Sequence, residues 1–176
     1  MSKFYKVYLL FIARIKGGVW LARKLGVSVG DNCRIYTHNF GTEPFLISIG
    51  NKVTITSGVR ILTHDGATWL VENRDGARYQ RYGRVSIGNN VFIGINSIIM
   101  PDIEIDDNVV IGAGSVVTKS IPSNSVYAGN PAKYICSFDD YKAKVNESYI
   151  NNSSIDHISD YESRILYCIE LQNEKK

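Results

Sequence analysis

The feature of this sequence that most restricts its fold is a column of aliphatic residues spaced by six. The clearest part of the column consists of Ile87, Ile93, Ile99, Ile105, Ile111 and Val117. A second column of small or β-branched residues keeps the same spacing: Val91, Ser97, Ile103, Val109, Ser115 and Ile121. Both columns reappear upstream, clearly over 49–61 and faintly over 29–35. An α-helix would repeat every 3.6 residues and one extended strand every two, so neither explains this spacing.

A six-residue unit corresponds to one short strand and one corner, with two inward side chains that fill a narrow interior. Three units close a triangular coil of about 18 residues, and successive coils stack about 4.8 Å apart. We therefore expect a mainly β protein, a parallel β-helix in the form of a triangular prism. The spacing is interrupted twice, by two extra residues within 37–48 and by a longer segment that loops out over 65–84.

The interruptions and the ends of the repeat divide the chain. We expect an N-terminal helical segment over 1–28, a β-helix domain over 29–136 with the excursion loop 65–84, and a tail over 137–176 that contains a helix at 157–172. Gly17 and Gly18 mark a break or kink in the first helix. This helix is basic and amphipathic and could lie on an anionic membrane surface, although packing against the domain or a partner subunit is the preferred interpretation.

Charge, apolar runs and cysteine content argue against several classes of protein. The net charge of +3 is too small to indicate nucleic acid as the main partner. The longest apolar run, 7–13, is too short to span a bilayer, and Arg14 and Lys16 end it too early for a signal peptide. Three scattered cysteines form neither a disulfide framework nor a metal cluster. We expect a cytoplasmic protein without a metal.

Four segments carry a resemblance to a known family: TEPFLISIG, ILTHDG, IGNNVFIGINSIIMPDIEIDDNVVIGAGSVVTKSIP and GNPAK. Over residues 29–136 the chain resembles the hexapeptide-repeat acyltransferases. Within them it is most similar to short sugar and xenobiotic O-acetyltransferases, especially those of surface-polysaccharide pathways. The resemblance implies a left-handed coil, an exception to the usual right-handed crossover. It also implies a homotrimer, acetyl-CoA as co-substrate, and an active site between adjacent prisms.

Acetyl transfer to a hydroxyl requires a general base that accepts the proton of the acceptor, which suits a histidine. The chain has His38, His64 and His157. His64 ends the Ile61 unit where the long loop begins, and it matches the catalytic histidine of the family. A histidine before Asp-Gly is otherwise typical of a turn.

A histidine base needs an orienting partner on its other ring nitrogen. Subtracting one coil, with the two-residue insertion, places Glu43 beneath His64. Asp102 follows Ile99 as His64 follows Ile61, so it falls at the same corner one coil above. Asp65 is adjacent to His64 in sequence and is also expected to contact the acceptor. Each carboxylate could instead cap backbone N–H groups at a corner.

The acceptor and acetyl-CoA require further residues. The family's acceptor-binding asparagine matches Asn39, and aromatic loop residues could stack on a sugar or pack on the coil: Trp69, Tyr79 and Tyr82. By the resemblance, the backbone N–H of Gly94 serves the oxyanion, Lys133 meets the CoA phosphates, and Phe92 replaces a tryptophan that is frequent in the family. The remaining expected CoA contacts are Ala113, Gly114, Thr118 and Lys119.

The expected function is transfer of acetyl from acetyl-CoA to a sugar hydroxyl, less favourably to an amine, in a surface polysaccharide or its precursor. Asp102 stands where the family often has glycine. It adds a charge near the proposed base, so the resemblance does not identify the acceptor. Antibiotic acetylation on the same scaffold and a non-catalytic β-helix that binds or scaffolds remain alternatives. A zinc enzyme like the γ-carbonic anhydrases would need three histidine ligands, and only His64 lies well within the regular repeat.

Overall fold

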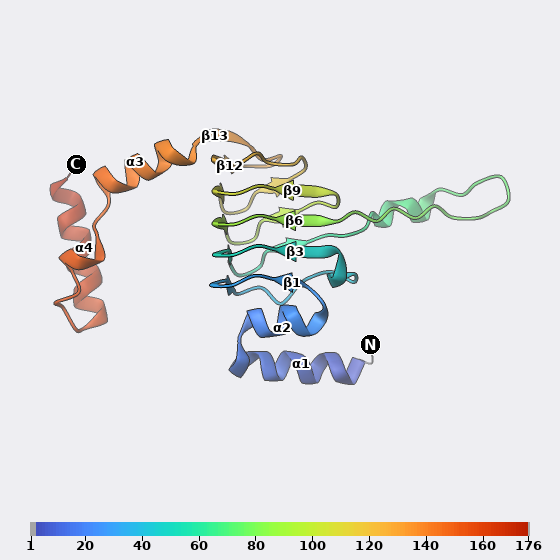
Figure 1. Cartoon of the computed structure of the whole chain (residues 1–176), viewed down its shortest axis with the longest axis horizontal. Helices are drawn as coiled ribbons and strands as arrows, with labels where there is room; N and C mark the ends of the chain where they lie inside the picture. Colours follow the sequence, from blue (N-terminus) through green and yellow to red (C-terminus); the bar gives the residue numbers. More distant parts are fainter. Residues whose placement is uncertain (1–2, 176) are drawn as a thin grey trace. The chain divides into compact units, whose positions relative to one another are not determined.

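The computed structural model describes the backbone of residues 3–175 and the side chains from residue 7 to residue 175; predictions for residues 1, 2 and 176 lie outside the described residues. The strands are short and follow one another around a coil (Figure 1). Their bounds are β1 Ser28–Val29, β2 Arg34–Ile35, β3 Ile47–Ile49, β4 Thr54–Ile55, β5 Arg60–Ile61, β6 Val85–Ile87, β7 Val91–Ile93, β8 Ile98–Ile99, β9 Ile103–Ile105, β10 Val109–Ile111, β11 Val116–Val117, β12 Ser125–Ala128 and β13 Lys133–Ser137.

The strands form three sheets that the chain visits in turn. Sheet A has the order β1-β3-β6-β9, sheet B the order β13-β12-β10-β7-β4-β2, and sheet C the order β11-β8-β5. All pairs are parallel except β12 with β13. Because consecutive strands belong to different sheets and return to the same sheet one coil later, the chain forms a three-sided parallel coil.

The strand register matches the arithmetic of the repeat. Strands β7 and β10 pair in register three repeat units apart, which is the expected length of one coil. Arg34 pairs with Thr54, two positions beyond the partner that an unbroken repeat would supply. Ile47 pairs with Val85, which lies beyond the regular partner by the whole of segment 65–84. Both insertions loop out without disturbing the stacking of the strands around them.

The interior of the coil contains the two predicted columns, and Phe40 and Ala22 are buried in the same cluster. Between Ile49 and Ile121 every member of either column is at most 5% exposed. The two serines in this interior satisfy their hydroxyl groups locally, because both Ser97 and Ser115 donate to the carbonyl of Gly112, at 3.0 and 2.6 Å.

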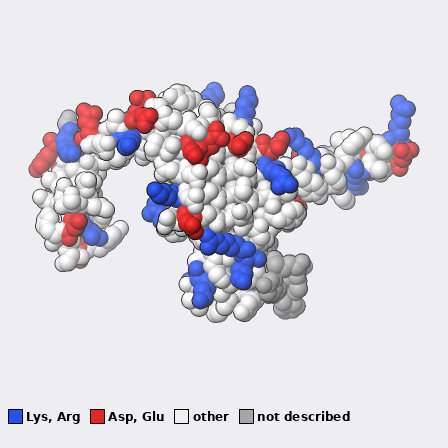
Figure 2. Space-filling view, viewed as in Figure 1, with Lys and Arg blue, Asp and Glu red and all other residues white. Residues whose placement is uncertain are grey.

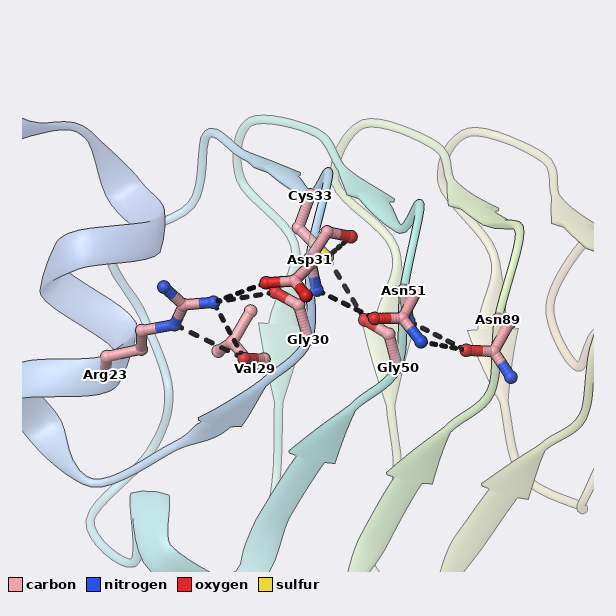
Figure 3. Close-up of polar contacts among 8 residues, drawn as sticks. All are labelled: Arg23, Val29, Gly30, Asp31, Cys33, Gly50, Asn51 and Asn89. Carbon is pink, nitrogen blue, oxygen red and sulfur yellow. Dashed lines mark hydrogen bonds and ion pairs between the residues drawn. The ribbon is translucent and has the colours of Figure 1, made fainter.

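The corners of the coil are held by side-chain ladders. Asn51 accepts a hydrogen bond from the backbone N–H of Asp31, and the Asn51 amide in turn donates to Asn89 (Figure 3). Several corner residues adopt the left-handed conformation that asparagine and aspartate tolerate best. They are Asn32, Asn90, Asn96, Asp102, Asn108 and Asn124, and Lys52 adopts the same conformation.

The N-terminal segment forms two helices, α1 (Lys3–Lys16) and α2 (Gly18–Leu25), instead of one. They separate at Gly17, whose φ of 84° is accessible to glycine without strain. Leu9 and Ala13 of α1 are buried with Leu21 of α2. Arg23 of α2 donates to the carbonyls of Val29 and Gly30, at 2.9 and 2.8 Å, and thereby ties the helices to the first coil (Figure 3). None of the described helices has the length and apolar content required to cross a bilayer.

The excursion is a narrow antiparallel arm that extends away from the coil between β5 and β6 (Figure 1). At its base the N–H of Asp65 donates to the carbonyl of Arg81 at 3.0 Å, and near its tip the N–H of Asn73 donates to Ala77 at 2.8 Å. A short 3-10 helix, η2 (Gly66–Leu70), follows the base. The arm is therefore a hydrogen-bonded ribbon and not an irregular loop.

Residues 139–176 form a separate compact unit. Its elements are α3 (Phe138–Ser148), η3 (Asn152–Ser154) and α4 (Tyr161–Glu174). The sequence predicts a helix at 157–172 in this tail but does not predict α3. The last helix begins at Tyr161 and not near residue 157, because the Asp160 carboxylate accepts a hydrogen bond from the N–H of Ser163 at 2.8 Å and caps the helix there.

The inward column predicts that alanine substitutions at Ile93 and at Ile95 change the free energy of unfolding by very different amounts. Ile93 is fully buried, whereas Ile95 is 49% exposed. We expect Ile93→Ala to lower the free energy of unfolding by about 2–5 kcal/mol through lost packing and the cavity left behind. Ile95→Ala, the matched control, should change it by about 0.5 kcal/mol or less. Urea unfolding at one protein concentration measures both, and equal losses would contradict the assignment of the interior column.

Candidate active site

Two edges of the coil carry the candidate residues. We call the C–A edge the corner where the chain leaves sheet C and enters sheet A, and the B–C edge the corner between sheets B and C. His64 follows β5 of sheet C at the root of the arm, and Glu43 precedes β3 of sheet A one coil below. The stacking arithmetic placed these two residues together, and in the structure they are in contact.

His64 and Glu43 form a hydrogen-bonded pair at the C–A edge. The His64 Nδ1 atom lies 3.0 Å from the Glu43 Oε2 atom, with the glutamate side chain 18% and the histidine side chain 44% exposed. Two threonine hydroxyls donate to the same carboxylate at 2.6 Å each, Thr42 to Oε1 and Thr63 to Oε2. The sequence reading missed both threonines, although each is adjacent in sequence to one member of the pair.

These hydrogen bonds stabilise the ionised form of Glu43. The hydroxyls of Thr42 and Thr63 contribute most to lowering the pKa of the Glu43 carboxyl from 4.5 to about 2, burial opposes them, and His64 adds a smaller lowering. The carboxylate is therefore ionised at neutral pH and can only accept hydrogen bonds. Consequently the Nδ1 atom of His64 carries the proton, and the Nε2 atom keeps a lone pair that can act as a base.

A pocket of about 340 Å³ adjoins His64. Leu62, Met100 and Pro101 give it an apolar wall, and Thr118 and Arg81 contribute to its lining. These lining residues come from the ends of sheet C strands on successive coils and from the returning side of the arm. No sequence motif could have identified Arg81, Met100 and Pro101 as pocket residues. Only the stacking of the coils and the path of the arm bring them close to His64.

Two aspartates near His64 have structural partners of their own. Asp65 lines the pocket, and its Oδ1 atom accepts a hydrogen bond from the N–H of Ala67 at 3.0 Å, which caps η2. Asp102 lies at the C–A edge as expected, but no hydrogen bond or ion pair joins its carboxylate to His64 among the described residues. Its backbone, with a φ of 65°, packs against Gly83 where the arm returns to the coil. In this chain Glu43, and not Asp102, is the carboxylate in contact with His64.

The aromatic residues of the arm differ in their relation to His64. The Tyr82 ring lies 6.2 Å from the His64 ring, measured between centroids. Trp69 lies farther along the arm, where the Arg78 guanidinium stacks 3.3 Å above its ring centre, and Tyr79 is exposed. Tyr82 is thus the aromatic residue that this chain itself brings to His64.

Asn39 lies away from His64 within the chain. It lines a different cavity of about 750 Å³ together with His38 and Asn96. The Asn39 Oδ1 atom accepts a weak hydrogen bond from the N–H of Gly41 at 3.4 Å. A single chain therefore does not combine Asn39 and His64 in one pocket.

The residues expected to contact CoA are distributed over several parts of the coil. Thr118 lines the His64 pocket, and Lys119 follows it at the C–A edge. Gly94, Ala113 and Gly114 instead lie at the B–C edge, between strands of sheets B and C. Phe92 projects from the outer face of sheet B, 41% exposed, and Lys133 begins β13.

The structure also corrects the role expected for Gly94. Its backbone N–H donates to the carbonyl of Ile111 at 2.8 Å, so this group is not available to an oxyanion. A Cβ atom at Gly94 would lie 2.5 Å from the backbone nitrogen of Ala113. Glycine is therefore required at this position by the close stacking of two coils.

Comparison with known proteins identifies related chains. Residues 84–119 match the family model described as bacterial transferase hexapeptide (six repeats). The chain is 48% identical over 157 residues to Protein CapG of Staphylococcus aureus, covering 88% of this chain and 82% of that protein. It is 34% identical over 152 residues to a galactoside O-acetyltransferase of Lactococcus lactis, covering 73% of this chain and 68% of that protein.

A solved structure is similar as well. A maltose O-acetyltransferase from Clostridium difficile 630 matches with a TM-score of 0.52 and 38% sequence identity. The match covers 64% of this chain and 59% of that chain, so it spans less than two thirds of the maltose O-acetyltransferase. Among residues 3–175 no group of three histidine, cysteine, aspartate or glutamate side chains is arranged to hold a metal ion.

The lowered pKa of Glu43 predicts a pH-dependent contribution to stability. A carboxyl with a pKa near 4.5 when unfolded and about 2 when folded stabilises the protein above pH 4.5, and the contribution is lost as the pH falls towards 2. We expect Glu43→Gln to lower the thermal unfolding midpoint at pH 6, and the difference from the parent protein to shrink between pH 5 and pH 2. The matched control Glu104→Gln removes an exposed carboxylate and should change the midpoint little at pH 6. A difference for Glu43→Gln that stays constant with pH would contradict the assignment.

Proposed function

Because the chain belongs to the hexapeptide-repeat acetyltransferases, we propose that it transfers the acetyl group of acetyl-CoA to a hydroxyl group of a sugar. The observation that carries this proposal is the His64–Glu43 pair beside a pocket with an apolar wall. A general base with an oriented ring and an adjacent acyl-binding surface is what direct acyl transfer to a hydroxyl requires.

The reaction follows from the orientation of the His64 ring. With Nδ1 held by Glu43, the Nε2 atom accepts the proton of the acceptor hydroxyl as its oxygen attacks the thioester carbonyl carbon. The new C–O bond forms and the C–S bond breaks, and the histidine returns the proton to the departing CoA sulfur. Glu43 acts as a positioning residue, because its ionised carboxylate also stabilises the protonated imidazole formed on the way.

The lining of the pocket supports a thioester as the donor. Leu62, Met100 and Pro101 offer an apolar surface for the acetyl group and the adjoining arm of CoA. Thr118 adds a hydroxyl on the same edge. Lys119 remains our candidate for a contact along CoA, and Lys133 remains our candidate for the CoA phosphates, as a point charge.

The division of candidate residues between two edges supports an assembly of several chains. His64 and Thr118 lie at the C–A edge, whereas Gly94, Ala113 and Gly114 lie at the B–C edge. A three-fold arrangement could bring the C–A edge of one prism to the B–C edge of the next, which would unite both sets in one site. We therefore propose a homotrimer with shared sites. The left-handed sense of the coil stays a prediction.

For the acceptor, we propose a sugar unit of a surface polysaccharide or its precursor. Tyr82, close to His64, offers a ring on which a sugar face can stack, and Trp69 and Tyr79 extend this aromatic character along the arm. A galactoside O-acetyltransferase and a maltose O-acetyltransferase among the similar proteins support a hydroxyl acceptor over an amine. Three free cysteines fit a cytoplasmic reaction.

Replacement of His64 tests the proposed base. We expect His64→Ala to lower the rate of acetyl transfer by about 10²–10⁴-fold, the usual contribution of a general base. Acetyl-CoA affinity should change little, because His64 acts on the acceptor proton. CoA release measured with a thiol reagent, using a galactoside, maltose and chloramphenicol as candidate acceptors, gives the rate, and calorimetry gives the affinity.

Two further histidine variants complete that test. His157 belongs to the separate C-terminal unit, so His157→Ala should leave the rate of acetyl transfer unchanged. If His64→Ala keeps near-parental turnover while His38→Ala loses it, the base is His38 and the proposal is wrong. Transfer to chloramphenicol alone would show that the acceptor is a xenobiotic and not a sugar.

The shared site predicts the mass of the assembly. We expect light scattering at micromolar protein concentration to give about three times the chain mass of 19.7 kDa. A monomer that retains full transferase activity would contradict both the homotrimer and the shared site, because one chain keeps the two edges apart.

A further inference from the structure

The positive charge of the chain is concentrated at its N-terminal end. The segment that ends at Gly30 contains six lysines and arginines and no aspartate or glutamate. They are Lys3, Lys6, Arg14, Lys16, Arg23 and Lys24. Since the whole chain carries a net charge of +3, the remaining residues carry a net negative charge. In Figure 2 blue side chains lie over α1 and α2, whereas red and blue side chains both lie over the coil.

Helix α1 also has an apolar face that this chain leaves uncovered. Val7, Phe11 and Ile15 recur every four residues, so they lie along one face of the helix. Their exposed fractions are 66%, 66% and 76%. On another face of the helix, Leu9 and Ala13 are buried against α2. The helix is therefore apolar on two faces, of which only one takes part in the fold.

The basic residues lie where they can accompany this apolar face. Arg14 and Lys16 are exposed in the last turn of α1, next to Ile15. A helix that combines a row of large apolar side chains with basic neighbours and no acidic residue is suited to the boundary between lipid headgroups and acyl chains. There the apolar side chains enter the lipid while lysine and arginine remain near the phosphates.

We propose that α1 binds an anionic phospholipid surface, with Val7, Phe11 and Ile15 inserted at the headgroup level. The charge argues for lipid over a contact of α1 with the α1 of a second copy, because two such faces would bring basic residues against basic residues. One short helix binds weakly. In the homotrimer proposed above, three copies of α1 would strengthen the binding by avidity.

The full-length protein is tested by flotation with two kinds of vesicle. One consists of phosphatidylcholine alone, and the other contains in addition about a third phosphatidylglycerol. We expect binding to the anionic vesicles only, weakened by raising the salt concentration. Phe11→Ser with Ile15→Ser should abolish binding, and Arg14→Gln with Lys16→Gln should weaken it by about fivefold per charge removed.

A matched control comes from the arm, where Leu70 and Val71 are also exposed. Leu70→Ser with Val71→Ser should bind vesicles as the parent protein does. Absence of vesicle binding by the parent protein, or binding unchanged by the α1 substitutions, would overturn the proposal. Dissociation of the assembly by Phe11→Ser with Ile15→Ser, without vesicle binding by the parent, would assign the face to a contact between copies and also overturn it. Transfer to a small acceptor without vesicles should be equal in the parent protein and the α1 variants, which separates this proposal from the proposed function.

Discussion

The whole structure depends on one constraint, the filling of a narrow interior by two side chains from every repeat unit. Ile61 stacks in register with Ile99 although the arm lies between them in the sequence. Burial of such a column offsets the entropy of ordering each coil, and each coil in turn provides the hydrogen-bonding edge for the next. Insertions are therefore tolerated only at corners, where they leave the inward positions unchanged. The short insertion before β3 and the arm before β6 both satisfy this condition.

The candidate site is built from those departures from the repeat. Glu43 belongs to the first insertion and His64 to the root of the second, and stacking places them one coil apart on the same edge. The regular coil provides rigidity, since Thr63 is buried while its hydroxyl holds the carboxylate. The candidate catalytic residues thus lie on irregular segments that the regular coil holds in place. This arrangement is common, because loops can vary in sequence without loss of the core.

The edges of the coil and the N-terminal helices have different roles in our proposals. Residues suited to one acyl-transfer site occur on two edges that a single prism holds apart, which explains why assembly and catalysis are linked in our proposal. The helices α1 and α2 stand outside this arrangement. Arg23 of α2 donates to two backbone carbonyls of the first coil (Figure 3). Val7, Phe11 and Ile15 on the outer face of α1 remain exposed.

The sequence by itself determined the coil, its period, the size of both insertions and the approach of Glu43 to His64, because inward spacing is a local pattern that counting alone can follow. Only the tertiary structure decided what happens at the corners. The return of the arm through Gly83 occupies the space beside Asp102, and the N–H of Gly94 belongs to the ladder with Ile111. The direction of a corner side chain and the partner of a backbone group depend on the path of other segments, and no period in the sequence encodes that path.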